Sequence, residues 1–226
     1  MHLGDLWVIM AAYNEAEVIG RVVAGLRPTA AKVVVVDDGS RDQTARVALR
    51  AGAIVLSHPV NLGQGAALAT GIQFALERGG AFVATFDADG QHRVEDLSRL
   101  YALLREGNAD VVLGSRFLGT AAEMPAARRL LLRAAVAFTR LTTGLRLTDS
   151  HNGLRVMTAA AAERIRITQN GMAHASEILE EIARHRLRVL EAPVTVLYTD
   201  YSLAKGQRSL NAVNILLDLL TGRLQR

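Results

Sequence analysis

The chain of 226 residues contains no cysteine, so disulfide bonds and thiol chemistry are excluded. It also lacks a run of about 18 apolar residues, the length that a membrane-spanning helix needs. The longest candidate, Leu130 to Leu141, is interrupted by Arg133 and Arg140. No N-terminal targeting pattern is visible, and together with the absence of cysteine this favours a reducing, cytoplasmic location.

Lysine is nearly absent as well. Lys32 and Lys205 are the only lysines among 26 basic residues, and the net charge is +4. Arginine binds phosphate and carboxylate through paired hydrogen bonds, so anionic substrates or lipid headgroups are expected partners. The basic residues form no patch interleaved with aromatic residues, which make up only 4% of the chain. Nucleic acid is therefore not an expected partner.

Half of the residues are apolar, which predicts a packed core. In the first half, short apolar runs alternate with helical patterns. Strands are predicted at Leu6–Met10, Lys32–Val36, Ala53–Ser57, Ala81–Phe86 and Ala109–Gly114, and helices at Glu15–Leu26, Thr44–Ala51, Gln64–Arg78 and Val94–Glu106. This alternation predicts an α/β fold with a mainly parallel central sheet and helices on both faces.

The rhythm changes after Gly119. Helices are predicted at Met124–Leu141, Ala159–Arg166, His174–Arg186 and Leu210–Leu224, with a strand at Arg188–Tyr198 and another after the turn in "TDSHNGLRVM". No internal repeat, low-complexity tract or linker is visible. We therefore interpret residues 1–226 as a single domain.

Polar clusters follow four of the predicted strands. They read "AAYNEAE", "DDGSRDQT", "DADGQH" and "SRF". Any one of them alone would be an ordinary loop with a helix cap. Because the carboxyl ends of parallel strands meet at one edge of a sheet, four such clusters predict a ligand site there.

Asp87 and Asp89 stand one residue apart directly after a buried strand. If the extended geometry continued through the turn, the two carboxylates would share a direction. Oxygen ligands with open coordination positions favour Mg²⁺ or Mn²⁺ completed by substrate phosphates. Gln91 can add a neutral oxygen and His92 a nitrogen.

Five motifs occur in an order and spacing that resemble family-2 glycosyltransferases, which have the GT-A fold. They are "VIMAAYNEAEVIG", "VVVVDDGSRDQT", "NLGQGAALATGI", "ATFDADGQH" and "VVLGSRF". The resemblance is closest to polyprenyl-phosphate sugar synthases, the dolichyl-phosphate mannose synthases among them. It is strong from Leu6 to Phe117 and weaker through "DSHNGLR" and "YSLAKGQ". It implies a nucleotide-sugar-binding half at 1–117 and an acceptor-binding half at 118–226.

The resemblance also implies residue roles. The nucleotide would be contacted by Ala12, Tyr13, Asn14, Glu15, Asp37, Asp38, Gly63 and Gly65, and the metal and diphosphate would be held by Asp87, Ala88, Asp89 and Gln91. Arg116 would lie close to the sugar and phosphates, Asp149 and Arg155 near the acceptor, and Lys205 and Arg208 in a basic loop that closes over phosphate. The expected catalytic residues are Asp89, Arg116, Asp149 and Lys205.

The implied activity is a metal-dependent, inverting transfer of a sugar from a GDP- or UDP-sugar to polyprenyl phosphate. One alternative is a saccharide hydroxyl acceptor in cell-surface polysaccharide synthesis, which needs a base such as Asp149 or Glu177. A sugar nucleotidyltransferase is a further alternative, but "AAYNE" is not its glycine-rich phosphate loop. The chain departs from the family pattern at Ala11, Gln64 and "HRV", and none of these removes a metal ligand.

Two predicted helices, Met124–Leu141 and Leu210–Leu224, combine apolar faces with arginines. This pattern is typical of helices that lie in a membrane interface, and it predicts peripheral contact with the inner face of the membrane. Packing of these faces against the sheet or a partner subunit explains the pattern equally well. The sequence leaves homo-oligomerisation, the nucleotide base, the sugar and the acceptor open.

Overall fold

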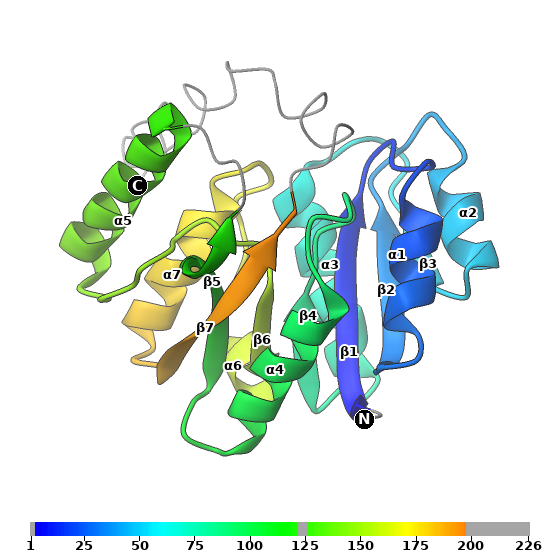
Figure 1. The fold of residues 1–226 in the computed structure, drawn as a ribbon. Helices are drawn as coiled ribbons and strands as arrows, with labels where there is room; N and C mark the ends of the chain where they lie inside the picture. The colour runs from blue at the N-terminus through cyan, green and yellow to red at the C-terminus, as the bar shows by residue number, and fades with distance from the viewer. Residues whose placement is uncertain (1–2, 122–125, 198–226) are drawn as a thin grey trace.

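The computed structural model describes residues 3–121 and 126–197 (Figure 1). Seven strands form one sheet: β1 (Leu3–Ala12), β2 (Ala30–Asp37), β3 (Ile54–Ser57), β4 (Phe82–Thr85), β5 (Val111–Ala121), β6 (Arg155–Thr158) and β7 (Val189–Val196). Their order is β3-β2-β1-β4-β6-β5-β7. Every neighbouring pair is parallel except those that include β6. The predicted mainly parallel α/β sheet is confirmed.

Helices cover both faces of the sheet, as predicted (Figure 1). They are α1 (Ile19–Leu26), α2 (Thr44–Arg50), α3 (Gln64–Glu77), α4 (Val94–Arg105), α5 (Ala126–Thr143), α6 (Ala159–Arg164) and α7 (His174–Arg184). One apolar core lies between the sheet and α1, α2 and α4, and the other lies between the sheet and α3, α6 and α7. Alternation along β2 supplies both cores, because Val33 and Val35 face the first and Val34 and Val36 the second.

The reversed direction of β6 brings an additional loop to the functional edge. β5 runs parallel to β4 and ends at the same edge, and β6 pairs antiparallel with both, with Arg155 opposite Thr85 and Leu113. The chain therefore enters β6 at the edge where β1, β2, β4 and β5 end. Residues 149–154 consequently lie beside the turns that follow those strands.

The first helix begins later than the sequence pattern predicts, at Ile19 instead of Glu15. The backbone N–H groups that would start it are bound by the loop after β2: Glu15 N donates to Thr44 Oγ1 at 2.8 Å, and Ala16 N donates to Asp42 Oδ2 at 3.2 Å. Asn14 adopts a left-handed φ of 53°. The two loops are thus fastened together and keep residues 13–16 out of the helix.

Helix α5 lies to one side of the sheet, next to α7 (Figure 1). Its Leu130 and Leu141 are 71% and 85% exposed. Within the part of the chain that the structure describes, no helix is both long and apolar enough to cross a membrane. The helix predicted at Leu210–Leu224 lies outside the described residues.

Candidate active site

Most of the predicted site residues lie at one edge of the sheet, on the ends of β1 and β2, the turn after β4, the β5 segment around Arg116 and the loop that leads into β6. These are Ala12–Glu15, Asp37, Asp38, Asp87–Asp89, Gln91, Arg116, Asp149 and Arg155. Lys205 and Arg208 lie outside the described residues. A polar edge above a sheet that is apolar on both faces is the usual place for a ligand in this architecture.

The side chain of Asp87 is held between two neighbours at the end of β4. His92 Nε2 lies 3.0 Å from Asp87 Oδ2. Gly153 approaches so closely that a β-carbon built on it would lie 2.2 Å from the same oxygen. Burial raises the pKa of Asp87, but the hydrogen bond from His92 and the charges of His92, Arg155 and His174 outweigh it, and the pKa is lowered. Asp87 is therefore ionised at neutral pH.

Asp89 has a different environment from Asp87. β4 ends at Thr85, and Asp89 lies in a turn, so the extended geometry that would align the two carboxylates does not continue to Asp89. Gln91 N donates to Asp89 Oδ1 at 3.0 Å. Burial and the nearby charge of Asp87 together raise the pKa of Asp89 to about 6. The two carboxylates repel each other, and a divalent cation bound to both would relieve that repulsion.

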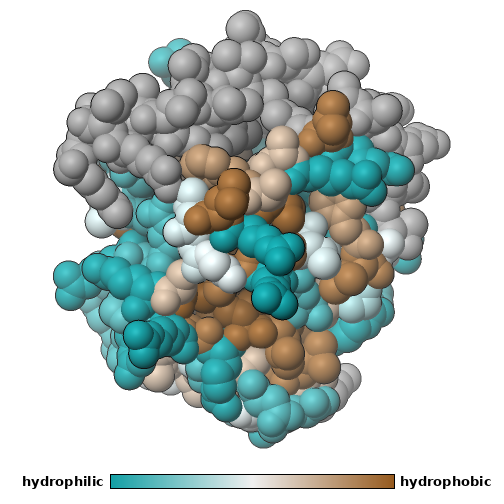
Figure 2. Space-filling view, turned by 90° about the vertical axis from the view of Figure 1, so that its left-hand side faces the viewer, coloured by the Kyte–Doolittle hydropathy of each residue, from teal (hydrophilic) through white to brown (hydrophobic). Residues whose placement is uncertain are grey.

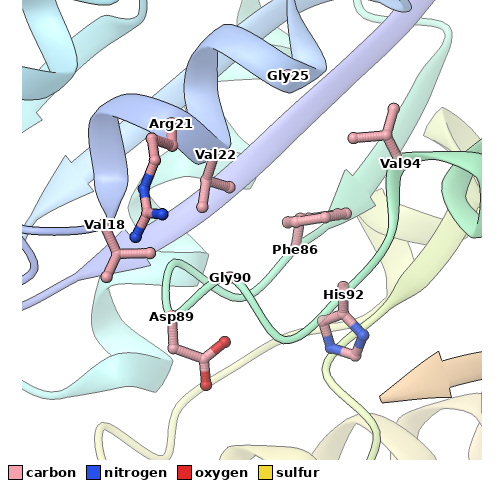
Figure 3. A pocket seen from close by; sticks show the side chains of 9 residues that line it. All are labelled: Val18, Arg21, Val22, Gly25, Phe86, Asp89, Gly90, His92 and Val94. Carbon is pink, nitrogen blue, oxygen red and sulfur yellow. The ribbon is translucent and has the colours of Figure 1, made fainter. Parts of the chain in front are cut away.

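A cavity of about 420 Å³ lies between α1 and the turn that carries Asp89 (Figure 3). Val18, Val22, Phe86 and Val94 make most of its wall apolar. Asp89 lines this cavity, whereas Asp87 packs against Gly153 and His92. The Asp87 side chain is 30% exposed, so both carboxylates remain partly accessible.

His92 supports Asp87 from the protein side. The sequence suggested its ring as an additional metal-binding nitrogen. In the structure the residue is buried, its Nε2 is used by Asp87, and its ring packs edge-on against Phe86 with centroids 5.6 Å apart. Among residues 3–121 and 126–197, no three His, Asp or Glu side chains gather in a metal-binding group. The protein ligands for a cation are therefore few, and substrate oxygens would complete them.

Arg116 and Asp149 form a buried ion pair beside the two carboxylates. Asp149 Oδ2 accepts hydrogen bonds from Arg116 Nε at 2.6 Å and from Arg116 N at 3.1 Å. Arg116 Nη2 donates to His151 O at 2.7 Å. The Asp149 side chain is 0% exposed, so a substrate hydroxyl cannot reach it in this arrangement. Asp149 orients Arg116 and is not placed to act as a base.

Arg155 is a buried cation at the start of β6, with 3% of its surface exposed. Its guanidinium makes no hydrogen bond or ion pair with any residue that the structure describes. Burial lowers the pKa of Arg155, while the charges of Asp87 and Asp149 act in the opposite direction. A buried guanidinium that has the nearby charges of Asp87 and Asp149, but no hydrogen bond to a described residue, favours an anion bound close by.

Asp38 holds the loop before α3 instead of facing a ligand. Its carboxylate accepts hydrogen bonds from Leu62 N at 2.9 Å and Gly63 N at 2.7 Å, and it pairs with His58 Nδ1 at 2.7 Å. Asp37 differs, because its buried Oδ1 has no hydrogen-bond partner among the described residues. Of this predicted acidic pair, Asp37 has the oxygen without a described partner, but that oxygen is enclosed in this arrangement.

Gly63 and Gly65 allow two loops to cross. A β-carbon on Gly63 would lie 2.3 Å from Asn170 O, and one on Gly65 would lie 1.9 Å from Gln169 O. Glu177 fixes the second loop by accepting from Gln169 N at 2.9 Å, and the residue is buried. Glu177 is therefore not on a solvated helix face, although it lies on the amphipathic helix α7. Neither glycine is shown in contact with a ligand, so their nucleotide role stays a prediction.

His151 makes the stability of the protein depend on pH. Burial lowers the pKa of His151 to about 4 from its usual 6.5; Asp149 raises it, and the charges of Arg155 and Arg116 lower it. Between these two values the unfolded chain binds more protons than the folded one, so the free energy of unfolding falls as the pH drops from 6.5 to 4. Asp89 acts in the opposite sense because its folded pKa is raised.

The pH dependence of the free energy of unfolding is compared between the wild type and the variant His151→Gln. Both proteins contain Asp89, so its contribution cancels in the difference. The wild type should lose ~2–3 kcal/mol of stability relative to the variant across this window, measured by urea unfolding at several pH values. A stability difference that does not change with pH would contradict a buried, neutral His151.

Comparison with known proteins assigns the family. The model of "Glycosyl transferase family 2" matches residues 7–166. The chain belongs to glycosyl transferase family 2. The predicted family is confirmed, and the edge that carries Asp87, Asp89 and Arg116 is the candidate active site of a glycosyltransferase.

Two relatives of this glycosyltransferase have names that state an acceptor. A UDP-N-acetylglucosamine–dolichyl-phosphate N-acetylglucosaminyltransferase from Methanococcus voltae is 29% identical, with 95% of this chain and 94% of the relative covered. An undecaprenyl-phosphate mannosyltransferase from Micrococcus luteus is 33% identical, with 83% and 81% covered. Both names describe transfer of a sugar to a polyprenyl phosphate.

A solved structure shows the same fold. Glucosyl-3-phosphoglycerate synthase from Mycobacterium tuberculosis, in complex with Mg²⁺ and uridine diphosphate, superimposes with a TM-score of 0.74. The two chains are 19% identical, and the match covers 96% of this chain and 78% of the other. At this identity the likeness concerns the fold alone, and it confirms the GT-A architecture.

Sequence reasoning missed three contributions to the site of this glycosyltransferase. Gly153 has no β-carbon and so leaves space for the Asp87 carboxylate. His92 Nε2 pairs with Asp87, and His151 O accepts a hydrogen bond from Arg116 Nη2. Gly153 and His151 lay within the recognised "DSHNGLR" segment, but nothing in that pattern showed which strand end the segment would meet. The antiparallel entry into β6 supplies that information.

Proposed function

We propose that this glycosyltransferase moves a sugar from a nucleoside-diphosphate sugar to polyprenyl phosphate, with inversion at the sugar carbon. The observation that carries the proposal is that two carboxylates, Asp87 and Asp89, lie at one edge of the sheet together with the buried guanidinium of Arg155, which has no hydrogen bond to a described residue. This arrangement suits a cation and an anion that bind together, as a metal-bound diphosphate does. The polyprenyl-phosphate names of the two relatives support the choice of acceptor.

The residues present fit a divalent cation. Asp87 is ionised, Asp89 faces the cavity, and the amide of Gln91 is near enough in the chain to add an oxygen. Hard oxygen donors of this kind favour Mg²⁺ or Mn²⁺, and the solved neighbour contains Mg²⁺. When bound, such an ion stabilises the negative charge of a departing diphosphate.

The chain itself supplies further stabilisation for the leaving diphosphate. Arg116 Nη1 has no hydrogen bond to a described residue, although Nε and Nη2 are both engaged. The guanidinium is thus fixed through Nε and Nη2, and Nη1 can donate to a ligand. A fixed donor of this kind stabilises charge that develops during the reaction more than it stabilises the bound substrate.

The nucleoside would occupy the ends of β1 and β2. The ring of Tyr13 is 39% exposed there, and an aromatic ring can stack on a base. Asp37 Oδ1 is buried without a partner among the described residues, and it would accept from a ribose hydroxyl or a base N–H once the turn after β2 opens to the ligand. Neither contact selects between uridine and guanosine.

A phosphate acceptor agrees with the geometry better than a hydroxyl acceptor does. An attacking phosphate is already ionised near neutral pH and needs no general base, whereas a saccharide hydroxyl does. Both candidate bases are engaged elsewhere: Asp149 is enclosed with Arg116, and Glu177 holds the Gln169 loop. Attack from the side opposite the diphosphate would invert the sugar carbon.

A panel of ligands tests the proposal. Melting temperatures are measured with UDP, GDP and their sugars, each with and without Mg²⁺ or Mn²⁺, because a ligand of the folded state raises the melting temperature. Donors that bind are then incubated with short-chain polyprenyl phosphate and with a saccharide acceptor. Transfer to the saccharide alone, or stabilisation by no nucleotide, would overturn the proposed function.

Helix α5 is the proposed contact with the membrane that holds the acceptor. It exposes Leu130 and Leu141 together with Arg129, Arg133 and Arg140. Figure 2 shows the side of the molecule that carries this helix, and hydrophobic and hydrophilic residues lie side by side on it. Exposed leucines flanked by arginines suit the interface of an anionic bilayer.

Replacing both Leu130 and Leu141 with serine should weaken binding to anionic vesicles by about tenfold or more, since each buried leucine contributes on the order of 1.5–3 kcal/mol. Sedimentation with vesicles at low salt measures the change. Leu49→Ser is the matched control, because Leu49 is 62% exposed on the distant helix α2. Equal losses in both proteins, or no binding by the wild type, would contradict a contact through α5.

A further inference from the structure

Glu191 lies on the edge strand β7, three strands away from β4, and its carboxylate accepts hydrogen bonds from a single turn. Glu191 Oε2 accepts from Thr148 N at 2.8 Å, and Oε1 accepts from Thr148 Oγ1 at 2.9 Å and from Asp149 N at 3.1 Å. Three donors from two consecutive residues thus converge on one side chain. This fixes both the position and the rotation of the peptide that precedes Asp149.

The turn held by Glu191 is the turn that holds Arg116. Asp149 Oδ2 binds both Arg116 Nε and Arg116 N, so a shift of the Asp149 backbone would carry the guanidinium with it. A second tie runs through Thr148, whose Oγ1 lies 2.7 Å from Ser115 Oγ. The chain of contacts runs from Glu191 through residues 148–149 to Arg116.

We propose that Glu191 is a positioning residue for sugar transfer: it fixes the turn at residues 148–149, and through Asp149 it aims the guanidinium of Arg116 into the site. The expected change in kcat rests on the proposed function, whereas the expected change in the position of Arg116 does not. Arg116 has one donor nitrogen left over, Nη1, and the direction of that nitrogen is set by the two that are bound. Misplacement of a charge-stabilising group by about 1 Å can lower a rate by about 10²-fold.

The variant Glu191→Gln tests the inference with little change in volume. An amide keeps one accepting oxygen but turns an NH₂ group toward the N–H groups of the turn. We expect kcat for sugar transfer to fall by about 10- to 100-fold, with little change in donor KM. When kcat is calculated per folded enzyme, with the unfolded fraction measured in the same sample, a lower kcat at unchanged KM reports loss of transition-state positioning.

Asp110→Asn is the matched control. The Asp110 carboxylate accepts hydrogen bonds from the backbone N of Arg188 at 2.8 Å and from Arg188 Nη2 at 2.8 Å. It thereby links the starts of β5 and β7, far from the candidate site. Both variants therefore weaken a carboxylate tie that involves the β7 segment, but only Glu191 binds the turn at residues 148–149. Similar kinetic losses in both variants would mean that Glu191 only stabilises the fold, and the inference would fail.

A double variant and a measurement without substrate complete the test. In an Arg116→Lys background, Glu191→Gln should lower kcat by less than about twofold further, because its effect passes through the Arg116 guanidinium. Full additivity would contradict this route. In ¹⁵N-labelled protein, the Arg116 Nε–H should exchange with solvent at least ~tenfold faster in Glu191→Gln than in the wild type or in Asp110→Asn.

The exchange measurement needs no activity. If the wild type transferred no sugar to any acceptor, the proposed function would fail, while unchanged Arg116 Nε–H exchange in Glu191→Gln would separately overturn the positioning role.

Discussion

Replacing Asp89 with asparagine is expected to lower sugar transfer by on the order of 10³-fold while the fold is kept. Asp89 lines the cavity, and its loss removes one of the two paired carboxylates that would hold a cation. Turnover is measured in Mg²⁺ and Mn²⁺ and again after chelation. The control is Asp5→Asn, because the Asp5 side chain is 57% exposed at the far end of β1 and should be dispensable.

The same variant should be more stable than the wild type in metal-free buffer at neutral pH. The pKa of Asp89 is raised to about 6, so the ionised carboxylate disfavours the folded state. This penalty is absent below the unfolded value of 3.8 and develops as the pH rises through about 6. Allowing for partial exposure, we expect a gain of ~1–2 kcal/mol at neutral pH that vanishes near pH 4.

The loss of turnover and the gain in stability must both be observed to identify Asp89 as a residue kept for function. A variant that gains stability and loses turnover identifies a side chain retained for function at a cost to the fold. Full turnover of Asp89→Asn in chelator would show that no metal is held there. A loss of stability at neutral pH would show that Asp89 is a structural residue.

The strands and their shared edge could be predicted because the local pattern is strong. Val33–Val36 is a β-branched run that suits a strand buried on both faces, and β2 forms there. Asp37 and Asp87 each end such a run, so parallel alternation alone places them at one edge. The direction of β6 could not be predicted in this way, because the sequence does not show at which edge of the sheet the chain enters that strand.

The partners of the charged residues could not be predicted from the pattern. Asp38, Asp149 and Glu177 all occur in motifs that suggest contact with substrate, yet each binds groups of its own chain. Their partners are supplied by loops far away in sequence, and no local periodicity encodes such a meeting. Arg155 shows the converse, because its lack of a partner becomes visible only when its surroundings are known.

The close approach of Gly153 to Asp87 leads to the second large expected effect. Gly153→Ala should lower transfer by about 10²-fold or more and lower the free energy of unfolding by about 1–3 kcal/mol. The added β-carbon would lie 2.2 Å from Asp87 Oδ2, 2.3 Å from Oδ1 and 2.5 Å from Cγ. No positive φ is involved at Gly153, so the effect would come from this contact and not from backbone strain.

Neither the Asp87 carboxylate nor the backbone of Gly153 can move away easily. His92 Nε2 lies 3.0 Å from the Asp87 carboxylate, and Gly153 O accepts from Thr85 Oγ1 at 2.6 Å directly before β6. The carboxylate must therefore rotate out of place, and binding of Mn²⁺, followed by electron paramagnetic resonance titration, should weaken together with turnover. Gly25→Ala is the control, since its β-carbon would meet its nearest atom, Val94 Cγ2, at 3.7 Å. If Gly153→Ala bound Mn²⁺ and turned over like the Gly25 variant, the carboxylate of Asp87 would not be a metal ligand in the position seen here.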